Sequence, residues 1–194
     1  MNTSPTLSKK ILLLTGVTLS LLLIPLIAMQ FTEEVVWSLS DFVLAGILLF
    51  GTGLSYLIIT MKAGSNTYKI ATGLGLGSGL FLIWANLAVG LIGSENNPEN
   101  QMYFSVIVVG IIGAVLSRLK ARGMMITLFS MAASMIVISI IAFSMGAHLY
   151  PHSSVMEIIG VTCFFVVPFV LSGLLFRNAA DLEIETGTTE AKNG

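Results

Sequence analysis

The stretch MMITLFSMAASMIVISIIAFSMGA, Met124–Ala147, contains no acidic residue, no basic residue and no proline. A helix needs about 20 mostly apolar residues to cross the hydrocarbon core of a bilayer, so this stretch predicts a transmembrane helix. Five further runs of this kind occur, at Ile11–Met29, Phe42–Met61, Ile70–Gly93, Met102–Leu119 and Val155–Phe176. Charged residues enter them only at Arg118 and Glu157, near the ends of their runs, where Arg118 can extend toward the headgroups.

The composition agrees with a chain that lies in a membrane. Of the 194 residues, 55% are hydrophobic and only 10% are charged, and the mean hydropathy is +0.94. Soluble domains carry about 25% charged residues, so this chain lacks the polar surface that a water-soluble protein needs. We therefore expect an all-α fold, a polytopic membrane bundle of six transmembrane helices. A net charge of −1 without a basic patch excludes a nucleic-acid partner, and no motif indicates a cofactor.

The basic residues predict the orientation of the bundle. They are Lys9, Lys10, Lys62, Lys69, Arg118, Lys120, Arg122, Arg177 and Lys192. All nine fall on one side of the six predicted helices, whereas the other side carries acids, both histidines and no Lys or Arg. Because cytoplasmic loops are enriched in Lys and Arg, both termini are expected in the cytoplasm, with the bundle in the cell's inner (plasma) membrane. The first run is too long for a signal peptide and no Ala-x-Ala site follows it, so we expect it to be retained.

The chain is expected to form one transmembrane domain, residues 1–177, followed by a cytoplasmic tail, residues 178–194. The tail is polar and acidic and shows no hydrophobic periodicity, so it is predicted to be disordered.

Four glycines in the third run predict close helix packing. Gly73, Gly75, Gly77 and Gly79 form two overlapping Gly-x-x-x-Gly pairs, which let helix backbones approach closely in membranes. The run lacks the strand–turn–helix setting of a phosphate-binding loop. Packing against another helix is therefore the expected role of these residues.

Most of the extracytoplasmic acids are explained by helix capping. Asn97, Pro98 and Glu99 have the order of an N-cap, a first-turn proline and a first-turn acid. Ser38 with Asp41 resembles a capping box. Thr32 is expected to cap a short interfacial helix that continues into the second run. In such a continuous helix Glu34, Trp37 and Asp41 would share one face.

Two residues are not explained by capping. Asn86 lies inside the predicted third helix, about 10 Å from its end at Gly93, and an intramembrane amide is costly unless it is paired. Glu95 follows the C-terminus of that helix, where the helix dipole disfavours a carboxylate. Asn86 is therefore expected either to bind a neighbouring helix or, together with Glu95, Asp41 and Glu34, to line a shallow outer pocket. Carboxylate and amide oxygens would suit a small hard cation such as Ca²⁺ or Mg²⁺, or a polar solute.

One other metal pattern is present. Met145, His148, His152 and Met156 form a string of soft ligands that could suit Cu(I). Methionine is common in apolar helices, so packing explains this string more simply and the metal is left unknown.

Two segments resemble those of a family of small, uncharacterised multi-pass bacterial inner-membrane proteins. The first is WSLSDF, residues 37–42, and the second is NLAVGLIGSENNPENQMY, residues 86–103. The family has no established activity, so the resemblance implies a bacterial membrane location and no reaction. It places Asn86 and Glu95 inside the longer segment.

Taken together, the sequence favours a small bundle of the transporter or channel type, or an accessory membrane subunit, with a polar site on the extracytoplasmic side. An enzyme is less favoured, because no nucleophile–base pair lies at depth. The alternative is a structural or assembly partner, whose glycine-rich faces dock another membrane protein or a second copy of the chain. Its surroundings in every case would be the lipid bilayer.

Overall fold

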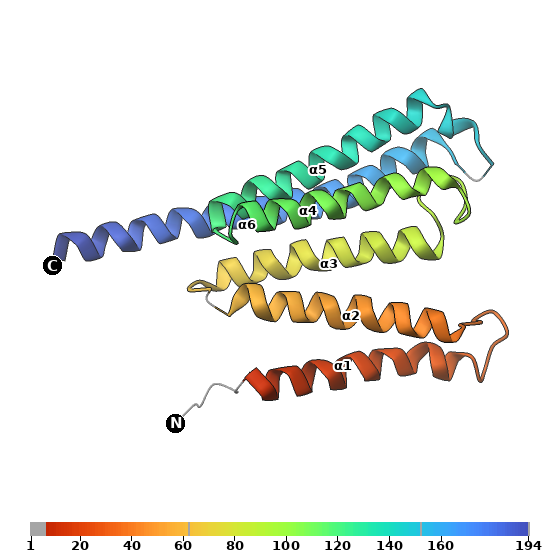
Figure 1. Ribbon diagram of the computed structural model, residues 1–194. Coiled ribbons are helices and arrows are strands. Elements are labelled where there is room, and N and C mark those ends of the chain that lie inside the picture. The colour runs from red at the N-terminus through yellow and green to blue at the C-terminus, as the bar shows by residue number, and fades with distance from the viewer. Residues whose placement is uncertain (1–6, 62, 152, 194) are drawn as a thin grey trace. The chain divides into compact units, whose positions relative to one another are not determined.

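The computed structural model describes residues 7–61, 63–151 and 153–193, with side chains as far as Glu185. Its regular elements are α1 (Leu7–Ala28), α2 (Leu39–Thr60), α3 (Asn66–Ala88), η1 (Pro98–Tyr103), α4 (Phe104–Leu116), α5 (Ala121–Ser144), η2 (Ala147–Leu149) and α6 (Val155–Asn193). Within these ranges all regular structure is helical, which confirms the all-α prediction (Figure 1). Six helical segments of the described chain are long and apolar enough to cross a membrane, with η1 and α4 counted as one. This is the make-up of a multi-pass membrane protein.

The chain divides into two compact units, Met1–Met61 and Lys62–Gly194. In the first unit, α1 and α2 form a hairpin whose contact depends on small residues. A Cβ atom added to Gly53 would lie 2.2 Å from Leu14 Cδ1, and one added to Gly46 would lie 3.5 Å from Leu22 Cδ1. The absence of a side chain at Gly53 thus admits a leucine of the opposite helix.

The connection from α1 to α2 corrects one prediction. No helix covers Glu33–Trp37, and α2 begins at Leu39. The hydroxyl of Thr32 accepts only the Glu34 N–H, at 3.1 Å, which is a local turn rather than a helix cap. The β-branched pair Val35 and Val36 in this segment disfavours a helix. Glu34, Trp37 and Asp41 therefore do not share one helical face.

The start of α2 does follow the prediction. Ser38 accepts from the Asp41 N–H, and Asp41 Oδ2 accepts from the Ser38 N–H at 2.7 Å, which completes a capping box. Because each residue satisfies a backbone donor of the other, α2 has a defined first turn.

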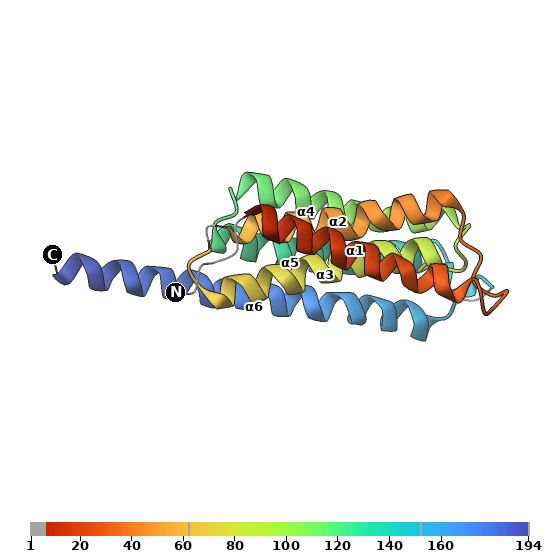
Figure 2. The ribbon, with the colours of Figure 1, turned by 90° about the horizontal axis from the view of Figure 1, so that it is seen from below.

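The second unit is a bundle of α3, α4, α5 and α6 (Figures 1 and 2). In it α6 packs against both α3 and α5, and α5 also packs against α4. Between α4 and α5 the contact is close: a Cβ atom added to Gly113 would lie 2.4 Å from Thr127 Oγ1, and one added to Gly110 would lie 2.9 Å from Met131 Sδ. Small residues therefore set the spacing of these helices, as expected where helices meet without a hydrophobic driving force.

The four glycines of α3 are divided between two faces of the helix. Gly75 and Gly79 are buried, and a Cβ atom added to Gly75 would lie 3.0 Å from Ser172 Oγ of α6 and 3.1 Å from Leu128 Cδ1 of α5. Beside this contact Ser172 donates to Ala71 O at 2.8 Å, which joins α6 to α3. Gly77 is exposed, and a Cβ atom there would meet nothing within 4 Å.

Gly73 and Gly77 instead line an apolar groove along α3 and α6. Its volume is about 290 Å³, and its other lining residues are Leu74, Ser78, Phe81, Phe164, Phe165 and Pro168. Of the two Gly-x-x-x-Gly pairs, the one formed by Gly75 and Gly79 therefore packs inside the unit, whereas the other borders open space.

The structure also corrects two predicted boundaries. The third helix ends at Ala88 rather than Gly93, because Gly90 and Gly93 have left-handed φ values of 71° and 70°, which an α-helix does not accommodate. The last helix does not stop at Phe176: α6 continues to Asn193, past the turn that joins α4 to α5 (Figure 1).

The continuation of α6 replaces the disordered tail that was expected from Asn178. Ala179 and Ala180 are buried, and the segment that follows contains Leu182 and Glu183, which are good helix formers. The composition of the tail predicted its polarity, but packing of the two alanines keeps its first turns helical.

Candidate functional site

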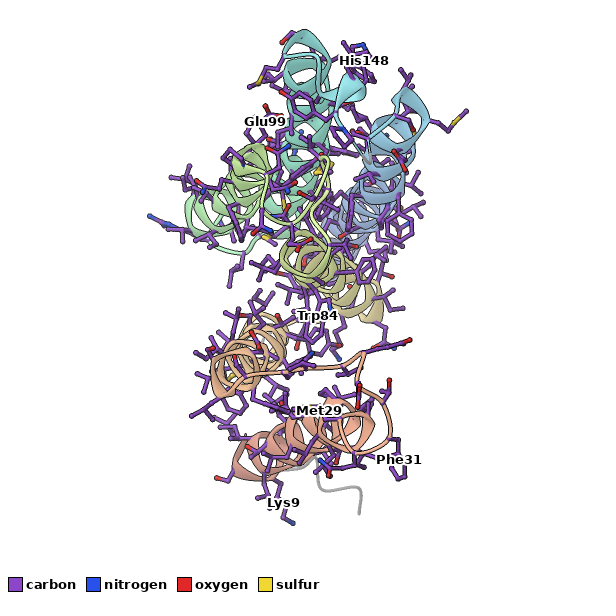
Figure 3. All side chains as sticks on the ribbon, turned by 90° about the vertical axis from the view of Figure 1, so that its right-hand side faces the viewer. Lys9, Met29, Phe31, Trp84, Glu99 and His148 are labelled. Carbon is purple, nitrogen blue, oxygen red and sulfur yellow. The ribbon has the colours of Figure 1, made fainter. Side chains whose placement is uncertain are left out.

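The candidate site lies at one end of the second unit, where α3 passes through a loop into η1 and where α5 passes through η2 into α6. This end is called the η1 end below, and it faces the viewer in Figure 3. The loop after α3 is tightly folded: a Cβ atom added to Gly90 would lie 2.5 Å from Ser94 O and 2.6 Å from Asn100 Nδ2. Glycine is therefore required at this position both by its left-handed φ and by space.

Asn100 holds the loop together. Its Oδ1 accepts the N–H groups of Leu91 and Ile92, each at 2.8 Å. Its Nδ2 donates to Ser94 O at 2.7 Å and to Ile92 O at 3.4 Å. The side chain is only 4% exposed, so one buried amide satisfies several backbone groups that would otherwise lack a partner. The loop is thus a built structure rather than a flexible connection.

Asn86 joins α3 to η1. It lies in the last turn of α3, is 4% exposed, and donates from Nδ2 to Asn100 O at 3.1 Å. The expected depth of about 10 Å was measured from Gly93, and it is wrong because the helix ends at Ala88. This hydrogen bond to η1 agrees with the expectation that Asn86 binds a neighbouring helix. The other half of the amide, Oδ1, is buried without a partner.

Glu99 connects the η1 loop with the segment between α5 and α6. As predicted, Asn97 caps η1 by accepting the Glu99 N–H at 3.0 Å, and Pro98 occupies the first turn. The Tyr150 hydroxyl donates to Glu99 Oε1 at 2.8 Å. This hydrogen bond raises the pKa of Tyr150 above its ordinary value, because the carboxylate favours the protonated hydroxyl. The two connections at the η1 end are therefore tied by a charge-assisted hydrogen bond.

Four buried polar atoms among the described side chains have no hydrogen-bond partner. They are Asn86 Oδ1, Glu99 Oε2, Tyr103 Oη and His148 Nδ1. All four belong to the η1 end, and Glu99 and His148 are both visible there in Figure 3. A buried polar atom without a partner costs about 1–3 kcal/mol, and folded proteins contain few of them. Such a group is a reason to expect water or a ligand at this end.

The other predicted site residues each have local surroundings of their own. Glu95 is exposed in the loop, well beyond the last turn of α3, where the helix dipole no longer acts on it. Its carboxylate accepts from Asn96 Nδ2 at 3.5 Å. Asp41 serves the capping box of α2, and Glu34 lies in the non-helical connection of the first unit.

Sequence reasoning assigned Glu99 to capping and did not single out Asn100 or Tyr150. The Tyr150–Glu99 hydrogen bond joins residues 51 positions apart, so no local pattern indicates it. The glycines at positions 90 and 93, ten and seven residues before Asn100, are a weak sequence signal of the folded loop. Among the described residues, no group of three or more His, Cys, Asp or Glu side chains is arranged to hold a metal ion. His152 of the predicted copper string lies outside the described residues.

Comparison of the chain with protein-family models, with curated proteins and with solved structures finds no match. The function proposed below therefore rests on the sequence and on the geometry of the η1 end.

Proposed function

We propose that the protein is a multi-pass protein of the inner membrane, of the transporter or channel type or an accessory subunit of such a protein, with a polar binding site at its extracytoplasmic end. The six apolar helices support insertion in a lipid bilayer. The one-sided distribution of the nine basic residues supports cytoplasmic termini and an extracytoplasmic η1 end.

The proposal of a binding site rests on the buried side-chain amide of Asn86. Asn86 is nearly fully buried, and its amide is only half satisfied: Nδ2 has a partner and Oδ1 has none. Burying Oδ1 without a partner costs free energy that a group paired with it would recover. A small cation or polar solute bound at Oδ1 would give this atom the partner that it lacks.

Permeation through proteoliposomes tests this proposal. Vesicles containing the full chain are exposed to gradients of sodium chloride, of potassium chloride and of the neutral solute urea, and swelling is followed by light scattering. Faster swelling than in empty vesicles for at least one solute, reduced by Asn86→Leu, is the expected result. The matched control is Asn96→Leu, the same substitution at an exposed position of the loop that follows α3. Equal swelling of protein-containing and empty vesicles for every solute would contradict a transport function.

A second candidate function is supported by the apolar groove of α3 and α6. A structural or assembly partner would place a transmembrane helix of another membrane protein against Gly73 and Gly77, where backbones can approach closely. A Cβ atom at Gly77 meets nothing within 4 Å, so Gly77→Leu adds its bulk to this groove. Loss of a stoichiometric co-purifying membrane protein in Gly77→Leu, at unchanged stability, would favour assembly over transport.

A further inference from the structure

Asn86 and Glu99 each present a buried oxygen that can only accept. The orientation of the Asn86 amide is fixed, because Asn100 O can accept a hydrogen bond only from Nδ2. Oδ1 is therefore the atom that remains. In Glu99 the Tyr150 hydroxyl occupies Oε1, and Oε2 remains buried without a donor. An ionised carboxylate has no proton to offer, so both vacant positions require a donor or a positive charge.

The two oxygens belong to one local arrangement. Asn86 holds the backbone of Asn100, and Glu99 is its immediate neighbour in η1. Tyr103, in the same short helix, contributes a third unpaired oxygen and is 2% exposed. The last turn of α3 and η1, which Asn86 joins through the Asn100 carbonyl, thus carry three buried oxygen atoms without partners, from an amide, a carboxylate and a hydroxyl.

Within the described part of the second unit, the segments that form the η1 end carry no Lys or Arg that could fill these positions. Neither Lys nor Arg occurs between Lys69 and Arg118, nor between Arg122 and Arg177. Lys69 is near the start of α3, about 25 Å from Asn86 at 1.5 Å per residue. The other titratable groups described at this end are Glu95, Glu157, His148, Tyr103 and Tyr150. The acids without Lys or Arg make the potential at this end negative, which attracts cations.

From these contacts we infer that the η1 end binds one small monovalent cation of the sodium class, held by Asn86 Oδ1 and Glu99 Oε2. Oxygen atoms prefer hard cations. A single carboxylate balances one positive charge, whereas Ca²⁺ sites use several carboxylates among six to eight oxygen ligands, and no cluster of three acids or histidines is present in the described chain. This inference rests on the polar site of the proposed function. It specifies a monovalent cation where that proposal allowed either a small cation or a polar solute.

The test measures the thermal unfolding of the purified full chain in detergent micelles, with sodium chloride exchanged for choline chloride at constant ionic strength. Tryptophan fluorescence reports unfolding. A bound ion stabilises the folded state, so Tm should rise with the logarithm of sodium concentration once the site fills. Glu99→Gln should raise the half-saturating sodium concentration by at least about tenfold, because ligand charge sets the affinity of such sites.

Glu95→Gln is the matched control, since it removes the same charge from the same loop at an exposed position. It should leave the half-saturating concentration unchanged. An equal effect of the two variants, an equal Tm in sodium and choline, or stabilisation by calcium chloride alone would overturn the inference. If Glu99→Gln does not fold, the sodium NMR line of the native chain is the test. Broadening that disappears when the sample is saturated with potassium chloride at equal ionic strength supports binding selective for sodium, and no broadening overturns the inference.

The failure of this inference is distinct from that of the proposed function. Vesicles that swell in urea but show no sodium-dependent Tm would retain a polar transport site and exclude the cation. A sodium-dependent Tm without permeation of any solute would retain the cation site and exclude transport.

Discussion

Replacement of Gly75 by alanine measures how closely α3, α5 and α6 are packed. The added Cβ atom would lie 3.0 Å from Ser172 Oγ and 3.1 Å from Leu128 Cδ1. Ser172 cannot move freely, because it is fully buried and donates to Ala71 O at 2.8 Å. Overpacking of this kind costs about 1–3 kcal/mol, and weakening the hydrogen bond adds about 0.5–1.5 kcal/mol.

Alanine also favours the helix over glycine by about 0.5–1 kcal/mol, so the net loss for Gly75→Ala should be about 1–3 kcal/mol. Gly77→Ala is the matched control, one half-turn along the same helix. Its Cβ atom meets nothing within 4 Å, so only the gain in helix propensity remains and the variant should be stabilised by about 0.5–1 kcal/mol.

Unfolding by SDS in mixed micelles, followed by tryptophan fluorescence, gives the free energy of both variants. The chain has two tryptophans, and Trp84 lies in α3 itself. The two alanine variants should differ in unfolding free energy by about 1.5–4 kcal/mol. Equal stabilisation of both would refute the reasoning, because it would mean that Gly75 is not in close contact with α5 and α6.

Three further predictions follow from the sequence and the site. In a chain without its native cysteine, a cysteine at Asn96 should react with a membrane-impermeant thiol reagent in intact cells and one at Lys120 should not; labelling at Lys120 would overturn the orientation. Asn100→Ala should destabilise the second unit by about 3 kcal/mol or more and speed amide exchange of the α3–η1 loop, since several backbone groups lose a buried partner; unchanged exchange would show that the loop does not depend on this amide. Because the pKa of Tyr150 is raised in the folded chain, the stabilising bond to Glu99 should be complete below the ordinary tyrosine value of about 10 and lost as pH rises beyond it; an ultraviolet difference titration of native chain against Tyr150→Phe should place this ionisation above that value, and a midpoint at or below it would contradict the bond.

Local features of the sequence were enough to predict the helices and several of their ends. The apolar runs predicted six helices because the requirement for about 20 apolar residues applies to each segment separately. The capping box of Ser38 and Asp41 and the Asn97 cap of η1 were predictable for the same reason, since a cap involves only residues within one turn. Both are present in the structure.

Other features depended on neighbours that the sequence does not identify. The four glycines of α3 have equivalent spacing, yet only the contacts with Ser172 and Leu128 distinguish Gly75 from Gly77. The apolar run also continued through Gly90 and Gly93, so composition alone extended the helix to a point where the backbone turns. The depth assigned to Asn86 and the helical face assigned to Glu34 were wrong for related reasons, because periodicity does not show where a helix stops.

The candidate site is the clearest case of this difference. From the sequence, Asn86 was a polar residue in an apolar run and Glu99 was a helix-capping acid. Only the tertiary structure joined Asn86 to Asn100 and Tyr150 to Glu99, and only then did the remaining oxygens appear as buried atoms without partners. Hydropathy and capping are properties of a few consecutive residues, whereas the satisfaction of a buried polar atom depends on every segment that packs around it.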